Sequence, residues 1–166
     1  MHIDPSEKKW AALTLVITFT MMGVLAGYAI KDNINPPSNV ETIDSTRLHL
    51  SEEFNEDNLG VHVGPDGSIR VVMVAARYGF FPQKLVVPAG RPVTFRIASA
   101  DVLHGIHTPK SNLNTMVVPG YVSEVTTTFR HTGRYPMLCN EYCGLGHDFM
   151  WSRIEVVPAD KFTAGG

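Results

Sequence analysis

Hydrophobic and polar positions divide the chain into an apolar segment, a polar segment and a series of short alternating runs. Residues 10–30 (WAALTLVITFTMMGVLAGYAI) contain no charged side chain. About 20 such residues are enough for a helix to cross the hydrocarbon core of a bilayer. We therefore expect one transmembrane helix over residues 10–30, preceded by a short N-terminal segment, residues 1–9.

The residues that flank the apolar segment indicate its orientation. Lys8 and Lys9 precede it and Lys31-Asp32 follow it, so the positive-inside rule favours a cytoplasmic N-terminus. A cleaved signal peptide is the alternative, because Gly27-Tyr28-Ala29 resembles a cleavage site, although the apolar core of a signal peptide usually spans about 7–15 residues. In both cases the rest of the chain is exported. We expect a single-pass anchor in the plasma membrane, with the remaining domain on the periplasmic side.

The next segment, residues 31–57, is rich in Asn, Pro, Ser and acidic side chains, which is typical of a linker. We expect a short helical turn in it, around residues 49–56. Residues 41–57 have a net charge of −5, whereas residues 66–166 carry ten Lys/Arg against seven Asp/Glu. The formal charge of the whole chain is −2, without the basic stripe of a nucleic-acid-binding protein, and this class is therefore excluded.

Short runs with β-strand character begin at about Leu59. In one of them, Val125, Thr127 and Phe129 alternate with polar side chains, which is the period of a half-buried strand. Seven or eight such runs indicate an all-β domain over residues 58–158, an antiparallel sandwich or Greek-key barrel, with residues 159–166 as a tail. The runs cover residues 61–63, 68–74 (joined to the first by a turn at 64–67), 84–88, 91–99, 121–130, 130–138 and 151–157.

A cluster of potential metal ligands lies between the last two of these runs. Two thiols, an imidazole and a thioether fall within twelve residues. Soft sulfur ligands favour copper, and a Cys/His set with a weak Met ligand is typical of electron-transfer copper sites. The segment DVLHGIH, which follows another run, adds a second imidazole. The candidate side chains are Cys139, Cys143, His147 and Met150, together with His104 or His107.

Three other interpretations compete with electron-transfer copper. Cys139 and Cys143 are the only cysteines of the chain, and two cysteines in an exported domain most often form a disulfide. A Cys₂His₂ zinc site is an alternative, but structural zinc does not need the methionine that follows. A mononuclear blue-copper site needs one cysteine and would leave the second thiol without a role.

Two segments of the sequence resemble those of a known family. CNEYCGLGHDFM is similar to the CuA loop of cytochrome c oxidase subunit II, whose shared form is C-x-E/Q-x-C-G-x-G-H-x-x-M. DVLHGIH resembles the segment that carries the first histidine ligand in that family, and the likeness extends over most of residues 70–157. The single anchor is most similar to subunits of B-type haem–copper oxidases. The resemblance implies a cupredoxin fold for the exported domain.

The resemblance also implies a binuclear copper centre, CuA. Two thiolates would bridge both coppers, each histidine would bind one copper, and a thioether and a main-chain carbonyl would complete the two ligand sets. The implied ligands are His104, Cys139, Glu141 (through its carbonyl), Cys143, His147 and Met150. His107 is expected to be a polar neighbour of the site and not a ligand.

In this family the centre accepts electrons one at a time from a cytochrome c or a small cupredoxin. It passes them to the haem of subunit I, where O₂ is reduced and protons are pumped. The resemblance therefore implies a subunit of a proton-translocating oxidase whose catalytic site lies on another chain. Two alternatives remain: the electron-entry domain of a nitric-oxide reductase, and a membrane-anchored copper-delivery protein.

Three weaker expectations concern residues outside the ligand set. The segment ARYGFFP is expected to expose aromatic side chains for docking of the donor. The carboxylate of Glu141 is a candidate ligand for magnesium at the interface with subunit I, because Mg²⁺ prefers oxygen ligands. Glu7, before the apolar segment, resembles a carboxylate at a proton-channel entry in B-type relatives. The aromatic side chains in question are Tyr78, Phe80 and Phe81.

Overall fold

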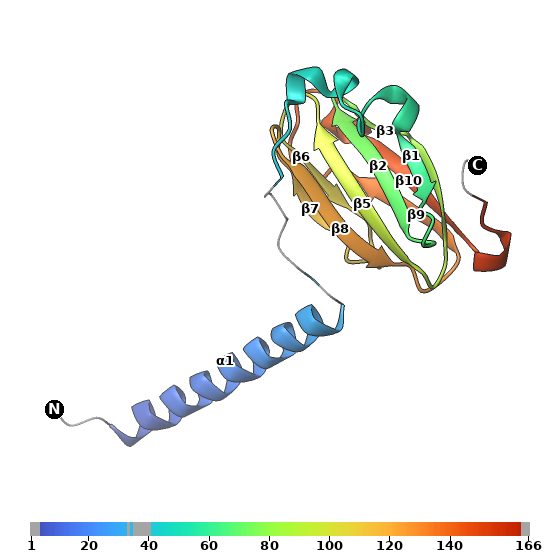
Figure 1. Cartoon of the computed structure of the whole chain (residues 1–166). Helices are drawn as coiled ribbons and strands as arrows, with labels where there is room; N and C mark the ends of the chain where they lie inside the picture. The colour runs from blue at the N-terminus through green and yellow to red at the C-terminus, as the bar shows by residue number, and fades with distance from the viewer. Residues whose placement is uncertain (1–3, 33, 35–40, 164–166) are drawn as a thin grey trace. The chain divides into compact units, whose positions relative to one another are not determined.

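The computed structural model describes residues 4–32, 34 and 41–163, and these fall into two units (Figure 1). The first unit is a single helix, α1 (Pro5–Lys31). It begins before the predicted apolar segment, because the Asp4 side chain caps it by accepting a hydrogen bond from the Ser6 main-chain N–H (2.8 Å) and proline is well suited to the first helical turn.

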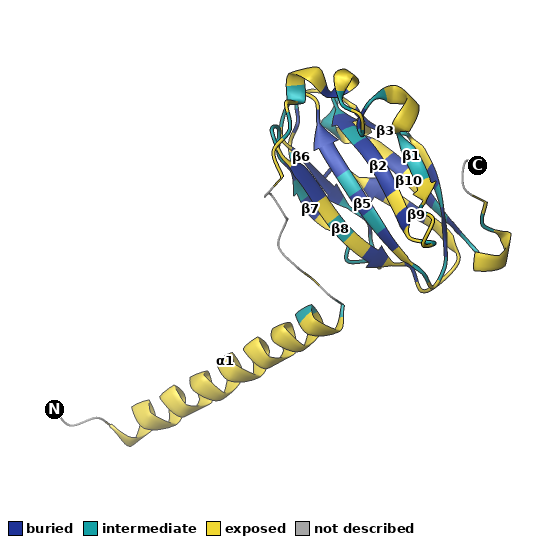
Figure 2. Ribbon diagram, viewed as in Figure 1, coloured by how far each residue is buried: buried dark blue, intermediate teal, exposed yellow. Residues whose placement is uncertain are grey.

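No residue of α1 is buried, so its apolar side chains have no protein surface to pack against within the part of the chain that the structure describes (Figure 2). An 18-residue window within the helix has a mean hydropathy of 1.9. By length and composition α1 can therefore cross a membrane. Glu7 lies in its first turn.

The second unit consists of two five-stranded sheets that stack face to face (Figure 1). The first sheet has the order β1-β2-β5-β8, with β3 paired to β2, and the second has the order β4-β10-β9-β6-β7. The strands of the first are β1 (Gly60–Val63), β2 (Ile69–Ala76), β3 (Gly79–Phe81), β5 (Pro92–Ser99) and β8 (Val122–Thr128). Those of the second are β4 (Lys84–Pro88), β6 (His104–His107), β7 (Asn114–Val117), β9 (Gly133–Leu138) and β10 (Trp151–Val157).

All seven predicted runs contain strands of this sandwich, and the predicted hairpin joins β1 to β2. The predicted all-β sandwich is confirmed, although it is not antiparallel throughout, since β2 pairs with β5 and β4 with β10 in parallel. Between the two strands of each parallel pair the chain crosses to the other sheet and comes back, so that the second strand can run in the same direction as the first. Three strands were not predicted (β3, β6 and β7), because three or four residues are too few to show a period.

The core lies between the two sheets, as the buried positions in Figure 2 show. In β8 and just after it, Thr127 and Phe129 are buried while their polar neighbours are exposed, which confirms the predicted alternation. The ring of Phe129 makes edge contacts with Phe95 and Tyr135, at centroid distances of 6.4 and 5.0 Å. Cys139, Cys143 and Met150 belong to the same buried cluster, so the candidate metal loop is continuous with the core.

Residues 41–57 were expected to belong to a linker, but side chains of this stretch pack against the first sheet. Leu48 and Phe54 are buried against side chains that include Val72, Ala98 and Val122. The predicted turn at 49–56 is replaced by two 3-10 helices, Ser45–Leu50 and Glu56–Asn58. Two apolar side chains in this acidic stretch thus cover an apolar area of the sheet that would otherwise face water. Residues 33 and 35–40 of the predicted linker lie outside the described residues.

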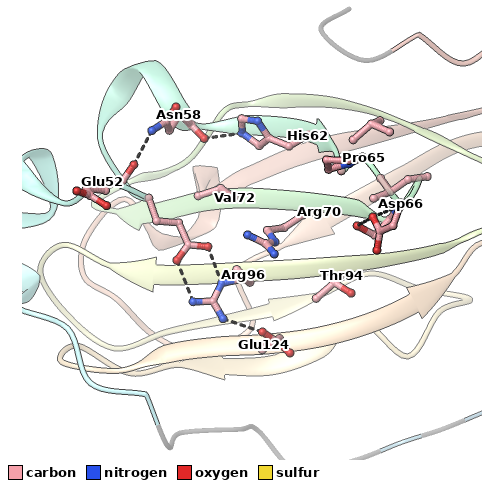
Figure 3. Close-up of a pocket in the computed structure, with 15 residues that line it drawn as sticks. Glu52, Asn58, His62, Pro65, Asp66, Arg70, Val72, Thr94, Arg96 and Glu124 are labelled. Atoms are coloured by element: carbon pink, nitrogen blue, oxygen red, sulfur yellow. Dashed lines mark hydrogen bonds and ion pairs between the residues drawn. The ribbon is translucent and has the colours of Figure 1, made fainter.

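An arginine on β5 forms ion pairs that hold residues 41–57 against the first sheet. Arg96 contacts the carboxylates of Glu41 (2.8 Å), Glu53 (2.6 Å) and Glu124 (2.7 Å). Figure 3 shows Arg96 and its contact with Glu124 in an open groove beside β2, and Glu53 also lines this groove. The hydrogen bonds to Glu53 and then to the other two raise the pKa of Arg96, although burial opposes this. Two of the acids that made residues 41–57 strongly negative therefore hold the segment in place.

Candidate metal centre

The loop of residues 139–150 joins β9 to β10 and is closed at its base by the strand pairing. Leu138 is opposite Trp151, and the main-chain N–H of Cys139 donates to the carbonyl of Met150 over 3.1 Å. Gly144 has a φ of +131°, a conformation that other residues adopt only with strain. A short 3-10 helix, His147–Phe149, follows it. The first and last candidate ligands are therefore brought side by side by the sheet itself.

The two thiols lie close together but are not bonded to each other. The distance from Cys139 Sγ to Cys143 Sγ is 3.9 Å, whereas a disulfide has an S–S length of about 2.05 Å. Cys143 Sγ also lies 3.5 Å from His147 Nδ1 and 3.5 Å from the Met150 sulfur. The disulfide interpretation therefore does not describe this structure.

The remaining candidates approach from the Cys139 side. His104, on β6, has its Nδ1 4.0 Å from Cys139 Sγ. The Cys139 thiol donates to the carbonyl of Glu141 over 3.2 Å. The structure thus brings together all six residues of the predicted ligand set, although their binding of a metal stays a prediction. His107 lies at the end of β6, half-buried and paired with Leu138.

The two thiols of the site are buried, and this limits which metal ions they can bind. Cys139 is 9% exposed and Cys143 5%, and His104 is fully buried. Burial, together with the neighbouring Cys139, raises the pKa of the Cys143 thiol to about 11. Two adjacent buried thiolates need a compensating cation, and thiolate, imidazole and thioether together suit a soft or borderline metal such as copper. The donor set therefore fits the copper centre that the sequence predicts.

The orientation of His104 is set by Asp101, which sequence reasoning did not assign to the site. Asp101 Oδ1 accepts the His104 Nε2–H over 2.8 Å, so the lone pair of Nδ1 faces Cys139. The other oxygen of Asp101 accepts the main-chain N–H of Arg77 over 2.8 Å. Burial raises the pKa of Asp101, but the hydrogen bonds from His104, Arg77 and Val102 outweigh it and the net shift is downward. Its position three residues before His104 was the available signal.

The aromatic segment 78–81 is exposed as predicted at Tyr78 and Phe81 but not at Phe80. Phe80 is fully buried, so its predicted exposure is wrong, because alternation along β3 turns Phe80 inward and Phe81 outward. Tyr78 is partly exposed but packs on the loop: a Cβ at Gly146 would lie 2.6 Å from its ring, and a Cβ at Gly144 would lie 2.7 Å from its hydroxyl. Tyr78 therefore covers the loop with one part of its ring, and a docking role for Tyr78 and for Phe81, which is 45% exposed, stays a prediction.

Five other large apolar side chains are exposed on or beside the loop, and we call them the loop apolar set. Leu145 is 94% exposed and Phe149 75%. Apolar side chains gathered in this way commonly mark an interaction surface. Their position among the ligands was the sequence signal that could have revealed them. The loop apolar set consists of Leu138, Tyr142, Leu145, Phe149 and Trp151.

A two-sheet sandwich that brings together cysteine, histidine and methionine side chains from the β9–β10 loop and the start of β6 is a cupredoxin-type domain, and in the chain it follows an apolar helix. The family model for the periplasmic domain of cytochrome c oxidase subunit II matches residues 66–157. The chain is 34% identical over 154 residues to cytochrome c oxidase subunit 2 of Thermus thermophilus. The aligned residues make up 90% of this chain and 90% of the relative. The chain belongs to the cytochrome c oxidase subunit II family.

Solved structures agree with this assignment. A haem–copper terminal oxidase dimer solved by cryo-EM contains a chain that is 26% identical, with a TM-score of 0.71, over 92% of this chain and 99% of that chain. The periplasmic domain of subunit II of the Bradyrhizobium japonicum oxidase shares the fold, at 21% identity and a TM-score of 0.52 over 56% of this chain and 86% of that one. The protein is thus subunit II of a haem–copper oxidase, and its apolar helix and periplasmic-type domain fit a single-pass membrane protein.

Proposed function

We propose that the loop of residues 139–150 and His104 hold a binuclear copper centre that receives electrons singly from a soluble donor and delivers them to the haem of subunit I. The donor would be a cytochrome c or a small cupredoxin. The observation that carries the proposal is the convergence of two unbonded, buried thiols with two imidazoles and a thioether.

Each ligand residue has a defined task in this proposal. Cys139 and Cys143 would act as bridging thiolates, His104 and His147 would each bind one metal ion, and Met150 and the Glu141 carbonyl would be weak ligands. When bound, the copper pair supplies a reversible one-electron carrier. The two sheets hold the ligands so that little moves when the charge changes, and burial keeps water away from the sulfurs.

The proposed orientation places the N-terminus of α1 in the cytoplasm and the sandwich on the periplasmic side of the plasma membrane, next to subunit I. The catalytic reduction of O₂, with proton pumping, would take place on subunit I. Magnesium binding by the Glu141 carboxylate and a proton-entry role for Glu7 stay predictions. Copper delivery is less well supported, because the thiols are at most 9% exposed and a site that hands over its metal needs accessible sulfur.

Copper counting with EPR on the full-length chain in detergent tests the proposal. We expect two coppers per chain and one unpaired electron whose hyperfine pattern shows equal sharing between two copper nuclei. A single copper with the pattern of one nucleus, or sulfurs of Cys139 and Cys143 covalently linked in copper-replete protein, would contradict it. The same spectrum would be expected of a nitric-oxide reductase, and turnover of the assembled complex with O₂ or NO separates the two.

The loop apolar set predicts how the donor docks. Leu145 is almost fully exposed, and replacing a side chain at the centre of an interface costs more than about 1 kcal/mol, or several-fold in affinity, whereas most peripheral replacements cost less. In the assembled oxidase, Leu145→Asp is expected to raise KM for the donor about tenfold with kcat little changed. Val63→Asp, at an exposed apolar position on β1, is the matched control.

Ionic strength provides an independent check on the same prediction. Apolar docking makes the rate of donor oxidation only weakly dependent on salt, whereas steering by charge makes it fall steeply. A steep fall with salt in the unmodified oxidase, or equal effects of Leu145→Asp and Val63→Asp, would show that the donor does not dock on the loop apolar set.

A further inference from the structure

Gly105 lies between the two histidines of β6 and has no role in the predicted ligand set. It is buried, and its φ is not in the left-handed region, so its main-chain conformation is open to any residue. The space around Gly105, however, does not have room for a side chain. A Cβ built on Gly105 would overlap Asn140 Oδ1 and lie 3.2 Å from both Asn140 Cγ and Glu141 Cβ. Close approach of the loop, and not backbone freedom, therefore requires glycine here.

The strand geometry explains why this contact matters for the site. Successive residues of a strand point to opposite faces, so while the imidazole of His104 is directed at Cys139, the adjacent Gly105 leaves room for the loop. Residues 140 and 141 occupy that room, and the Asn140 amide donates to Asn114 Oδ1 on β7 over 3.4 Å. The start of the loop is thus seated on β6 and β7.

Seating of the loop fixes the position of the Glu141 carbonyl. Its oxygen lies 3.2 Å from Cys139 Sγ, while the Cβ of the same residue is on the side of Gly105. The exposed side chain of Asn140 can partly rotate away from an added methyl group. The Cβ of Glu141 is bonded directly to the main chain, so it can yield only if the main chain moves, and the carbonyl moves with it.

We propose that Gly105 is a positioning residue whose missing side chain allows the Glu141 carbonyl to reach the metal site. The inference rests on the proposed copper centre. A methyl group at position 105 pushes Asn140 and Glu141 outward and withdraws the carbonyl from one of the two metal positions. The two thiols, the His147 imidazole and the thioether are not among the three closest contacts of the added atom, so these four groups should stay in place.

The test uses Gly105→Ala in the full-length chain, measured by copper content, EPR and reduction potential. We expect two coppers per chain as in the unmodified protein, but unequal hyperfine coupling to the two nuclei. We also expect a higher potential, since loss of an oxygen donor disfavours the oxidised state. Asn140→Ala alone removes the hydrogen bond to Asn114 and should leave the spectrum unchanged.

The double variant Gly105→Ala/Asn140→Ala identifies the cause. It removes the overlap with the Asn140 side chain and leaves the 3.2 Å contact with Glu141 Cβ, so the unequal coupling and the higher potential should persist. A full return to the spectrum of the unmodified protein would contradict the role given to Glu141. An unmodified protein without two coppers refutes the copper centre itself. With that centre present, an unchanged spectrum in Gly105→Ala overturns the inference, and so does failure of both Gly105→Ala and the double variant to fold while Asn140→Ala folds.

Discussion

Replacing Cys143 by serine is expected to abolish the binuclear centre and to reduce electron entry into the oxidase by more than about 100-fold. Removal of a residue that only hydrogen-bonds to a metal ligand already lowers metal affinity or activity by about 10–100-fold, and removal of a bridging ligand should cost more. Cys143 Sγ has three other donors within 3.9 Å: Cys139 Sγ, His147 Nδ1 and the Met150 sulfur. A serine hydroxyl stays protonated at neutral pH and is a hard oxygen donor, so it cannot replace a bridging thiolate.

Met150→Leu is the graded control for this prediction. Met150 is buried, like Cys143. The exchange of methionine for leucine nearly conserves volume, so the core should be preserved in the control. A weak thioether ligand is expected to tune the centre without holding it, and Met150→Leu should keep two coppers with an altered spectrum. Copper counting and EPR decide the matter: two coppers that share one electron in Cys143→Ser would mean that this thiol does not bridge them.

The ligand loop could be predicted from the sequence because its members are neighbours in the chain. Cys139, Cys143, His147 and Met150 lie in one hairpin connection, and the strands on both sides of it have clear patterns. The distance between the two thiols could not be predicted, because it depends on Gly144 and on the contact of the loop with Tyr78.

What the sequence did not reveal depends on contacts between distant segments. Arg96 joins Glu41, Glu53 and Glu124 across three separate parts of the chain. Local composition identified residues 41–57 as polar and acidic, but it could not show that Leu48 and Phe54 have an apolar surface to cover. Similarly, the pair Gly105 and Asn140 is defined only when β6 and the loop meet.

The burial of Phe80 illustrates the same limit on a smaller scale. A run of aromatic residues indicates that some rings are buried and some exposed, but the register of a three-residue strand decides which. Pairing of Ala75 with Phe80 and of Val74 with Phe81 settles it for β3. The most exposed apolar side chains of the sandwich are instead those of the loop, Leu145, Phe149 and Tyr142.

Removing the carboxylate of Asp101 is expected to weaken copper binding by 10–100-fold, the usual effect of losing the hydrogen-bond partner of a ligating histidine. In Asp101→Ala the Nε2–H of His104 loses its acceptor at 2.8 Å. The ring is then free to rotate or to take the other tautomer, in which Nδ1 carries the proton and cannot bind a metal. Competition titration of the full-length chain against a chelator of known copper affinity measures the loss.

Two further variants separate the orientation of His104 from the other contacts of Asp101. Asp101→Asn keeps an acceptor oxygen of the same size but loses the charge, so its copper affinity should fall between those of the unmodified protein and Asp101→Ala. Arg77→Ala removes only a partly exposed ion pair of 3.6 Å and retains the main-chain N–H that donates to Asp101. Exposed pairs of this kind contribute little, so Arg77→Ala should bind copper normally. If Asp101→Ala also binds copper normally, then the packing around the fully buried His104 is sufficient to orient the ring, and the carboxylate serves only the turn between β5 and β6.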